Sequence, residues 1–358
     1  MLNGKRILVA PLDWGLGHAT RCVPIVQALQ ARGAHVVLGA DGGPLELLRG
    51  EFPDLEHVRI PGAHIRYSRS RSQLWSMLRQ FPAMLRSVQA EQALFDRLRG
   101  ELKLDGVVSD QRFGVRSPDL PSVLITHQVF PFTPIAQPAL RKLNLRHIAR
   151  FHRCWVMDEP MAPGLSGELA HHDELPANAR FIGTVSRFSS TGPPPERQWD
   201  IVAVVSGPEP QRSLFEDALE QQLAAIPGRH LLVRGRPGTA RAGDRGGVQR
   251  VPHLPARELE TAMRSARMIV SRTGYTTLMD LATIGRTALL VPTPGQAEQE
   301  YLGHLHRGTG RFLVQDQHEL DVVGAWERLR DQASGEAKAD GHPMLEEALD
   351  DLEELLGQ

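Results

Sequence analysis

The stretch Val270-Ser271-Arg272-Thr273-Gly274-Tyr275-Thr276-Thr277-Leu278-Met279-Asp280 decides how this chain folds. The apolar residues that lead into it, from Met268, predict a strand, and its Ser, Thr and Gly residues predict a turn that opens a helix. A second strand, Ala288 to Val291, ends in a loop with Pro and Gly over residues 292–299. A strand, a turn, a helix and a second strand in this order indicate a parallel α/β sheet.

The turn and the loop suit a nucleoside diphosphate that is joined to a sugar. Backbone N–H groups at the start of a helix can hold the diphosphate. Asp280 can accept hydrogen bonds from ribose hydroxyls, and the amides of Gln296 and Gln299 can bind sugar hydroxyls. Arg272 is a candidate beside the phosphates, with a surface ion pair as the alternative. The predicted donor-binding residues of this stretch are Arg272, Thr273, Gly274, Thr276, Thr277, Asp280, Gln296 and Gln299.

Length and composition indicate a soluble globular protein of two domains. The chain has 358 residues, of which 41% are hydrophobic and 23% charged, and its two cysteines show neither disulfide nor metal-ligand spacing. No apolar run approaches the ~18 residues of a membrane span. The first residues lead directly into a strand, without a signal peptide. We therefore expect a cytoplasmic protein.

The strand and helix pattern occurs twice along the chain. In the first half, residues 6–12, 34–39, 106–109 and 122–125 read as strands, and residues 22–31 as a helix after a Gly-rich loop. In the second half, residues 200–205, 231–233 and 268–270 read as strands. We expect an N-terminal Rossmann-like domain (1–188), a Pro-rich linker (189–198) and a C-terminal donor domain (199–358). The two parallel sheets would face a central cleft, and an acidic helix over 345–356 could return to the N-terminal domain.

The first loop, residues 13–21, carries a candidate catalytic pair with Asp110. Gly17 lets a ligand approach the backbone closely, and His18 suits a general base for a sugar hydroxyl. Asp110 ends a predicted strand at the same sheet edge and could orient the imidazole. The alternatives are a histidine satisfied by backbone groups and an aspartate that caps a turn. Trp14 of the same loop is placed on the acceptor side.

Loops of the second half supply further donor candidates. Ser206 and Gly207 could line the diphosphate, and Arg212 could help to neutralise it. The backbone of His253 and Leu254 could bind a nucleobase edge, although a plain strand–loop–helix connection explains them equally well. The first loop gives only a partial dinucleotide fingerprint, because Thr20 stands where GxGxxG requires Gly, and this reading is weak.

The run from Val251 to Gln299 resembles the donor half of GT-B glycosyltransferases, most closely family 28, which includes the peptidoglycan N-acetylglucosaminyltransferases. The matching residues are Val251, Pro252, Ser271, Arg272, Gly274, Thr277, Gly285, Val291, Pro292 and Gln299. Asp280 replaces the usual Glu, and Glu300 stands where the family often has a second Gln. His127 and Gln128 resemble an acceptor-side loop of the family, and residues 15–18 are similar to its first glycine-rich loop.

The resemblance implies inverting transfer of a sugar from a nucleotide sugar, with a UDP donor, to a hydroxyl acceptor. His18 or Asp110 would activate the acceptor hydroxyl, while helix N–H groups and arginines stabilise the leaving diphosphate. No Asp-x-Asp motif is present, and no metal or other cofactor is expected. The alternatives on the same fold are a nucleotide-sugar hydrolase or epimerase and a non-catalytic sugar-nucleotide-binding subunit.

Charge is distributed unevenly along the chain. Residues 1–190 carry 23 Lys and Arg against 17 Asp and Glu, whereas residues 191–358 carry 18 against 25. No acidic residue occurs over 57–90 or 120–157, and both windows combine arginines with aromatic and aliphatic residues. This pattern predicts contact with an anionic membrane surface and a lipid-linked acceptor at the inner face of the membrane, without a nucleic acid partner. Core packing with solvated arginines explains it nearly as well.

Overall fold

The computed structural model describes residues 2–62, 74–133, 137–189, 195–237, 243–331 and 342–357, and the side chains of residues 74–85 and Arg245 are outside this description. The chain divides into two compact units, which are described one at a time. Among the described residues, the N-terminal unit comprises 2–62, 74–185 and 342–357, and the C-terminal unit comprises 186–331.

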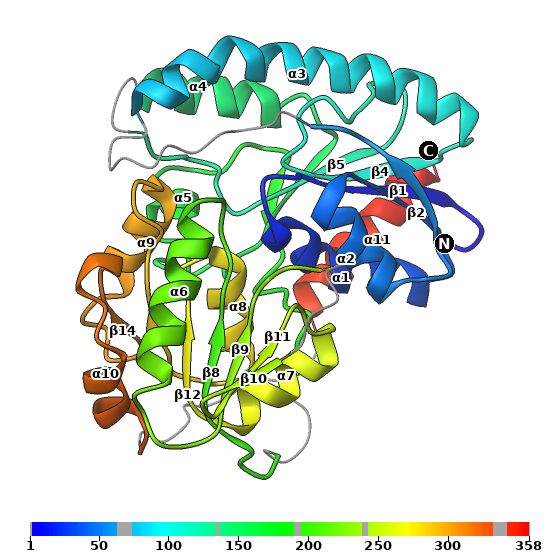
Figure 1. Cartoon of the computed structure of the whole chain (residues 1–358). Helices are drawn as coiled ribbons and strands as arrows, with labels where there is room; N and C mark the ends of the chain where they lie inside the picture. The colour runs from blue at the N-terminus through cyan, green and yellow to red at the C-terminus, as the bar shows by residue number, and fades with distance from the viewer. Residues whose placement is uncertain are drawn as a thin grey trace. The chain divides into compact units, whose positions relative to one another are not determined.

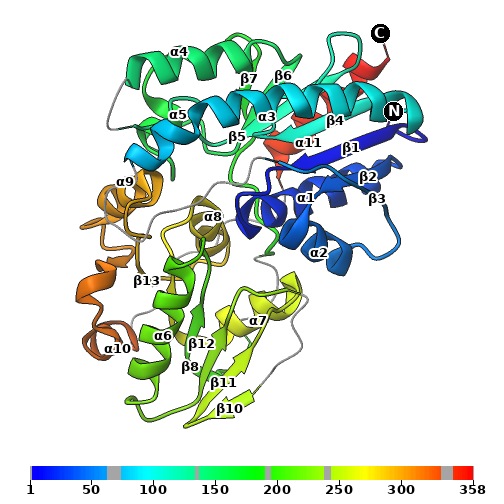
Figure 2. The same cartoon turned by 45° about the horizontal axis from the view of Figure 1, so that its top comes forward.

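The N-terminal unit is a seven-stranded parallel sheet with the strand order β3-β2-β1-β4-β5-β6-β7. Helix α3 lies on one side of this sheet, and α1 and α2 lie on the other (Figure 1, Figure 2). Its elements are β1 (Arg6–Pro11), α1 (Leu16–Ala31), β2 (His35–Ala40), α2 (Gly42–Glu51), β3 (Glu56–Arg59), α3 (Leu74–Glu101), β4 (Gly106–Asp110), β5 (Ser122–Thr126), α4 (Gln137–Ile148), β6 (Arg153–Val156), α5 (Glu168–His171), β7 (Ala179–Phe181) and α11 (Pro343–Leu356).

Burial of near-continuous apolar strands holds this sheet together. β1, β4 and β5 are buried almost throughout, as is typical of parallel strands covered on both faces. Phe95 and Leu98 of α3 pack against Leu8, Val37 and Val107 of the sheet. Burial of side chains of this size contributes roughly 1.5–3 kcal/mol each, so this contact is a principal source of the unit's stability.

The C-terminal unit repeats the architecture with the strand order β10-β11-β9-β8-β12-β13-β14, parallel except for the β10–β11 pair. Phe215, Leu219 and Ala325 join α6 and α10 to the sheet in one core. Its elements are β8 (Trp199–Val204), α6 (Gln211–Leu223), β9 (His230–Val233), β10 (Gly243–Arg245), β11 (Val248–Val251), α7 (Ala256–Ser265), β12 (Ala266–Ser271), α8 (Tyr275–Thr283), β13 (Leu289–Leu290), α9 (Ala297–His306), β14 (Leu313–Val314), η1 (Gln317–Glu319) and α10 (Val322–Leu329).

Each sheet has one point at which the strand order reverses. In the N-terminal unit it lies between β1 and β4, and in the C-terminal unit between β8 and β12. Open α/β sheets bind ligands beside the carboxyl ends of the strands at this point. The loops that follow β1, β4, β8 and β12 are therefore the candidate sites, and they carry most of the residues predicted from the sequence.

The last helix, α11, belongs to the N-terminal unit, where it appears in red beside α1 and α2 in Figure 1. Arg32, just after α1, donates hydrogen bonds to Glu346 at 2.6 Å and Asp350 at 2.6 Å. Arg153 of β6 forms a two-bond fork with Asp351 at 2.6 and 2.9 Å. The acidic face of α11 is thus paired with basic side chains of this unit.

The predicted fold class, two Rossmann-like domains with parallel sheets, is confirmed. Two expectations differ in detail. Residues 13–21 were expected to be a loop, but α1 begins at Leu16, so His18 and Arg21 lie on its first turns. The expected first domain ends at residue 188, whereas Ser186 to Phe188 group with the C-terminal unit. Residues 190–194 of the predicted linker lie outside the described residues.

Candidate functional site

The N-terminal switch point brings His18 and Asp110 together. β1 and β4 pair in parallel, which places the start of α1 beside the end of β4. His18 Nδ1 lies 3.0 Å from Asp110 Oδ2. The His18 side chain is 18% exposed and the Asp110 side chain is fully buried. An imidazole that is backed by a carboxylate and partly open to solvent is the arrangement of a general base with its orienting group.

Arg21, which sequence analysis missed, completes this cluster from the same helix. Residues three apart on a helix share a face, so Arg21 lies beside His18. Its Nε donates to Asp110 Oδ2 at 2.8 Å, and its Nη2 donates to Asp110 Oδ1. The remaining donors reach His18 Nδ1 at 2.7 Å and His127 Nδ1 at 2.7 Å. The i+3 spacing and the position of His127 after β5 were the available signals.

The charges of the cluster fix the state of Asp110. Burial alone would raise the pKa of this carboxyl, but Arg21 and His18 outweigh it and lower the pKa to about 2. Asp110 is therefore ionised at neutral pH. Burial and the Asp110 charge raise the pKa of the neighbouring Cys22 thiol, whose Sγ is 4.0 Å from Asp110, so Cys22 stays protonated.

The predicted acceptor-side residues lie around this cluster. His127 is buried after β5, and the Gln128 amide nitrogen is 3.2 Å from His127 Nε2. The Gln128 backbone carbonyl accepts from Asn144 of α4 at 3.1 Å. Among the described residues, the buried Trp14 Nε1 has no hydrogen-bond partner, so this indole could donate to a ligand.

The C-terminal switch point is built from small residues and hydroxyls. Gly207 has φ +106, a conformation that suits glycine, and a Cβ there would lie 3.5 Å from Thr293 Oγ1. No side chain caps helix α8 at Gly274. Thr273 Oγ1 and Thr293 Oγ1 are buried and have no hydrogen-bond partner among the described residues. Hydroxyl groups without partners, next to a helix N-terminus that no side chain caps, can donate hydrogen bonds to an anion.

Asp280 is held within the C-terminal unit by residues that precede β8. It accepts from Ser186 Oγ at 2.6 Å, and Arg187 Nε lies 3.5 Å from its Oδ2. Burial raises the pKa of Asp280, and Arg187 and Ser186 oppose this rise. A ribose hydroxyl would therefore have to share this carboxylate with Ser186.

The two arginines predicted beside the phosphates have other partners, which corrects that expectation. Arg272 is fully buried, stacks on Phe215 with 4.0 Å to the ring centroid, and donates to the backbone carbonyls of Gln211 at 2.9 Å and Pro292 at 3.2 Å. Burial lowers its pKa to about 9. Arg272 follows β12, and its hydrogen bonds connect this loop to the loop after β13 and to α6. It therefore stabilises the site without facing a ligand.

Arg212 is also engaged within its unit. It donates to Glu209 at 2.8 Å and to Glu216 at 2.7 Å, and its side chain is 7% exposed. Glu216 in turn accepts from Arg234, which follows β9. Two carboxylates neutralise Arg212, so its charge is not available to a diphosphate in this arrangement.

Side chains from the first turn of α9 hold the loop that follows β13. Gln299 Oε1 accepts from the Thr293 N–H at 2.9 Å, and Glu300 Oε1 accepts from the Gly295 N–H at 2.7 Å. Glu300, where the family often has Gln, therefore fixes the loop. Gln296 Oε1 is buried and has no partner among the described residues, so this amide remains a candidate for a sugar hydroxyl.

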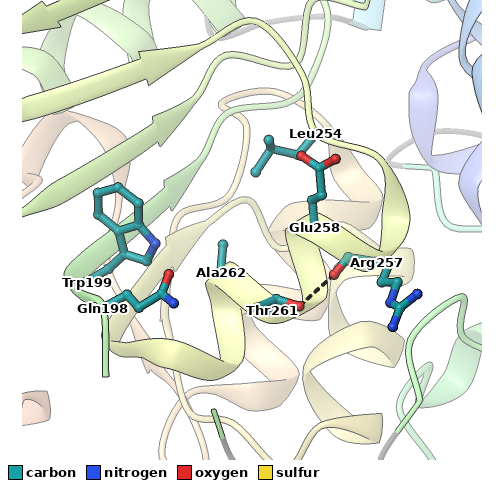
Figure 3. A pocket seen from close by; sticks show the side chains of 7 residues that line it. All are labelled: Gln198, Trp199, Leu254, Arg257, Glu258, Thr261 and Ala262. Atoms are coloured by element: carbon teal, nitrogen blue, oxygen red, sulfur yellow. Dashed lines mark hydrogen bonds between the residues drawn. The ribbon is translucent and has the colours of Figure 1, made fainter. Parts of the chain in front are cut away.

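The predicted nucleobase loop lies at the start of α7. Burial, together with Arg187, lowers the pKa of His253 to about 4, so this imidazole is neutral at pH 7. Leu254 lines a pocket of about 320 Å³ that runs along α7 (Figure 3). Its lining residues are Gln198, Trp199, Leu254, Arg257, Glu258, Thr261 and Ala262.

The described residues contain neither a cluster of metal-ligating side chains nor a helix that could span a membrane. No group of three or more His, Cys, Asp or Glu side chains there could hold a metal ion. In the part of the chain that the structure describes, every helix is too short or too polar to cross a membrane.

Comparison with known proteins supports this reading of the C-terminal unit. The glycosyltransferase family 28 C-terminal domain matches residues 255–306. A 78-residue segment is 36% identical to a UDP-N-acetylglucosamine–N-acetylmuramyl-(pentapeptide) pyrophosphoryl-undecaprenol N-acetylglucosamine transferase of Methylorubrum extorquens. The match spans about a fifth of each protein, 20% of this chain and 21% of the relative.

Solved structures show the fold of the whole chain. The calicheamicin glycosyltransferase CalG4 aligns with a TM-score of 0.62 at 15% identity, over 99% of both chains. MurG of Acinetobacter baumannii aligns with a TM-score of 0.55 at 14% identity, over 97% of this chain and 99% of that one. The chain is thus a GT-B-fold protein whose C-terminal unit carries a segment like the C-terminal domain of glycosyltransferase family 28.

Proposed function

We propose that this protein is an inverting glycosyltransferase that moves a sugar from a nucleotide sugar to a hydroxyl acceptor. The observation that carries the proposal is the His18–Asp110 pair at 3.0 Å, in a chain whose residues 255–306 match the glycosyltransferase family 28 C-terminal domain. The N-terminal unit supplies acid–base chemistry and the C-terminal unit supplies donor binding.

In the proposed reaction, His18 accepts the proton of the acceptor hydroxyl as its oxygen attacks the anomeric carbon. Asp110, ionised at neutral pH, stabilises the imidazolium that forms. The bond from the anomeric carbon to the diphosphate breaks, and negative charge develops on the leaving group. The N–H groups at the start of α8 and the hydroxyls of Thr273 and Thr293 would stabilise that charge.

The donor is proposed to be a UDP-linked sugar. Six similar proteins are named as UDP-N-acetylglucosamine transferases, whereas one structural neighbour, SsfS6 from Streptomyces, was solved with thymidine diphosphate. Asp280 would accept a hydrogen bond from a ribose hydroxyl while it keeps the one from Ser186. A carboxylate has about four lone-pair sites, so it can accept from both hydroxyls.

The acceptor is proposed to be lipid-linked and reached from the inner membrane surface. The relatives' names specify a pyrophosphoryl-undecaprenol acceptor. Helix α4 lies in the acid-free window and exposes Lys142 and Arg146, while Arg141 lies over the Phe132 ring at 5.8 Å. Basic and aromatic groups together suit an anionic interface. Arg66, Arg69 and Arg71 of the other window lie outside the described residues, as do the side chains of Arg79, Trp75, Met77, Leu78, Phe81, Met84 and Leu85.

A donor panel tests the proposal. The protein is incubated with UDP- and TDP-sugars, with and without lipid-linked and soluble hydroxyl acceptors, and release of the nucleoside diphosphate is measured. Acceptor-dependent release is expected. Release that is equally fast without any acceptor would identify a hydrolase, and nucleotide binding without turnover under every condition would identify a binding subunit.

Membrane contact is tested by co-sedimentation with liposomes. We expect binding to vesicles with anionic lipid that weakens as salt is raised. A Lys142→Glu, Arg146→Glu variant should bind less, while Arg307→Glu, an exposed arginine of the C-terminal unit, serves as the control. Equal binding to neutral vesicles would contradict the membrane proposal and leave the transferase proposal standing.

A further inference from the structure

Arg21 lies at the centre of the N-terminal site. Its side chain is 2% exposed. The planar guanidinium group contacts both carboxylate oxygens of Asp110, Nδ1 of His18 and Nδ1 of His127. The acceptor chemistry described above uses His18 and Asp110 and gives Arg21 no task. A buried cation that touches two histidines at their ring nitrogens can nevertheless decide where their protons reside.

A guanidinium has donors only and remains protonated in proteins. A ring nitrogen that bonds to it must therefore offer a lone pair. Two donors face the His127 ring: Arg21 Nη1 is 2.7 Å from Nδ1, and the Gln128 amide nitrogen is 3.2 Å from Nε2. A neutral imidazole accepts at only one nitrogen, and the shorter, charge-assisted contact is that of Arg21, so we assign the lone pair to Nδ1 and the proton of a neutral His127 to Nε2.

His18 Nδ1 has two competing neighbours. Arg21 Nη2 is a donor at 2.7 Å, and Asp110 Oδ2 is an acceptor at 3.0 Å. When Nδ1 accepts from Arg21, the proton lies on Nε2, and that nitrogen cannot take a proton from a hydroxyl. When Nδ1–H donates to Asp110, Nε2 has a lone pair and His18 is competent as a base.

We propose that Arg21 is a positioning residue that selects the tautomers of both histidines. In the free protein it holds His18 and His127 with their protons on Nε2. His18 becomes a base when its single ring proton has moved from Nε2 to Nδ1, by exchange with solvent at this 18% exposed side chain, and then faces Asp110. The tautomer assignment rests on geometry alone, whereas its meaning for catalysis rests on the proposed function.

The charges that face His18 are balanced when each imidazole carries a single proton. Asp110 comes from β4, Arg21 and the Cys22 thiol come from α1, and His127 follows β5. The Asp110 carboxylate compensates Arg21, so the competition at His18 Nδ1 decides which ring nitrogen carries the single proton, with the net charge unchanged.

Nitrogen-15 NMR of the imidazoles tests this proposal, because protonated and unprotonated ring nitrogens have well-separated chemical shifts. The full chain is labelled at its 15 histidines, and His18→Gln and His127→Gln variants assign the two rings. In the unmodified protein at neutral pH, both rings are expected to carry the proton on Nε2. A His18 ring protonated on Nδ1 would overturn the proposal.

Arg21→Gln removes the competing donor and is expected to move the His18 proton to Nδ1, facing Asp110. Arg116→Gln is the matched control, since Arg116 is a largely buried arginine of the same unit that donates to the Arg150 carbonyl at 3.4 Å. The His18 and His127 signals of this control should equal those of the unmodified protein. Unchanged tautomers in Arg21→Gln would refute the assignment.

Arg21→Lys keeps the experiment decisive if Arg21→Gln does not fold. A single ammonium keeps the charge but cannot reach Asp110 and both imidazoles with a planar fork, so at least one ring should change tautomer. Both rings keeping the proton on Nε2 would show that the fork is not required. None of these readouts needs turnover, so a protein without transfer activity could still confirm the proposal.

Discussion

The two switch points of this protein differ in the chemistry that they concentrate. At the N-terminal one, four titratable or charged side chains, His18, Arg21, Asp110 and His127, share direct hydrogen bonds. At the C-terminal one, the loops offer Gly207, two unpaired Thr hydroxyls and an uncapped helix start, while the nearby arginines are neutralised or buried. In the proposed function, one unit therefore supplies proton transfer, and the other binds an anion through uncharged groups.

The largest effect on transfer is expected from replacing His18, the proposed general base. His18→Gln should lower the transfer rate by about 10²–10⁴-fold, the usual contribution of a general base, and leave nucleotide affinity unchanged. Initial rates with a matched donor and acceptor, together with calorimetric nucleotide binding, would measure both effects. A rate near that of the unmodified enzyme would mean that another group takes the proton.

Asp110→Asn should affect stability as well as rate. It leaves the buried Arg21 without a full counter-charge, which costs roughly 3–5 kcal/mol in the free energy of unfolding. Denaturant unfolding would measure it. As a control for size, Asp105→Asn removes a half-exposed partner of Lys5 at 3.4 Å and should cost at most about 1 kcal/mol.

The same carboxylate predicts a pH dependence. The folded-state pKa of Asp110, about 2, is below its unfolded value of about 4, so its stabilisation is present above pH 4 and is lost as the pH falls towards 2. The gap in unfolding free energy between the unmodified protein and Asp110→Asn should therefore narrow over this range. A gap that is constant from pH 6 to pH 3 would contradict the assignment.

Changes at the C-terminal switch point should instead alter nucleotide affinity. Asp280→Asn should weaken nucleoside diphosphate binding by roughly 10- to 150-fold, because a hydrogen bond to a charged group contributes about 1.5–3 kcal/mol. The maximal transfer rate at saturating donor should change less than with His18→Gln. Isothermal titration with UDP measures the first effect, and an affinity equal to that of the unmodified protein would remove Asp280 from the ribose site.

The smallest expected effect is also the most specific. Thr293→Val deletes a buried hydroxyl that has no partner among the described residues, so the free energy of unfolding should stay equal or rise. If this hydroxyl binds the diphosphate, nucleotide affinity should fall by about 5-fold, corresponding to roughly 1 kcal/mol. Thr287→Val, at a half-buried position before β13, is the control, and loss of affinity in both variants would point to a general effect.

The fold and the approximate position of both sites could be predicted from the sequence, because strand periodicity and Gly-rich turns are local signals. The hydrogen-bond partners of individual side chains are harder to predict, because many of them are distant in sequence. Arg21 was overlooked because only the i+3 spacing connects it to His18, and its partners Asp110 and His127 are distant in sequence. Ser186 was unforeseen because it reaches Asp280 across 94 positions of sequence.

The roles of charged side chains are the hardest to predict from the sequence. Arg272 and Arg212 look alike in the sequence as phosphate ligands, but burial beneath Phe215 and pairing with Glu209 and Glu216 decide their roles. Such outcomes depend on desolvation and on neighbours that no local motif records.

The placement of α11 makes the C-terminal unit an insertion in the chain of the N-terminal unit. The polypeptide leaves the N-terminal unit after Val185 and returns to it at α11, which Arg32 and Arg153 fasten through three carboxylates. A single proteolytic cut between Val185 and Trp199 would therefore leave two fragments that still migrate together on gel filtration, although a denaturing gel would separate them. Helix α11 is a second connection between the two units, so the C-terminal unit would be retained after the first connection is cut.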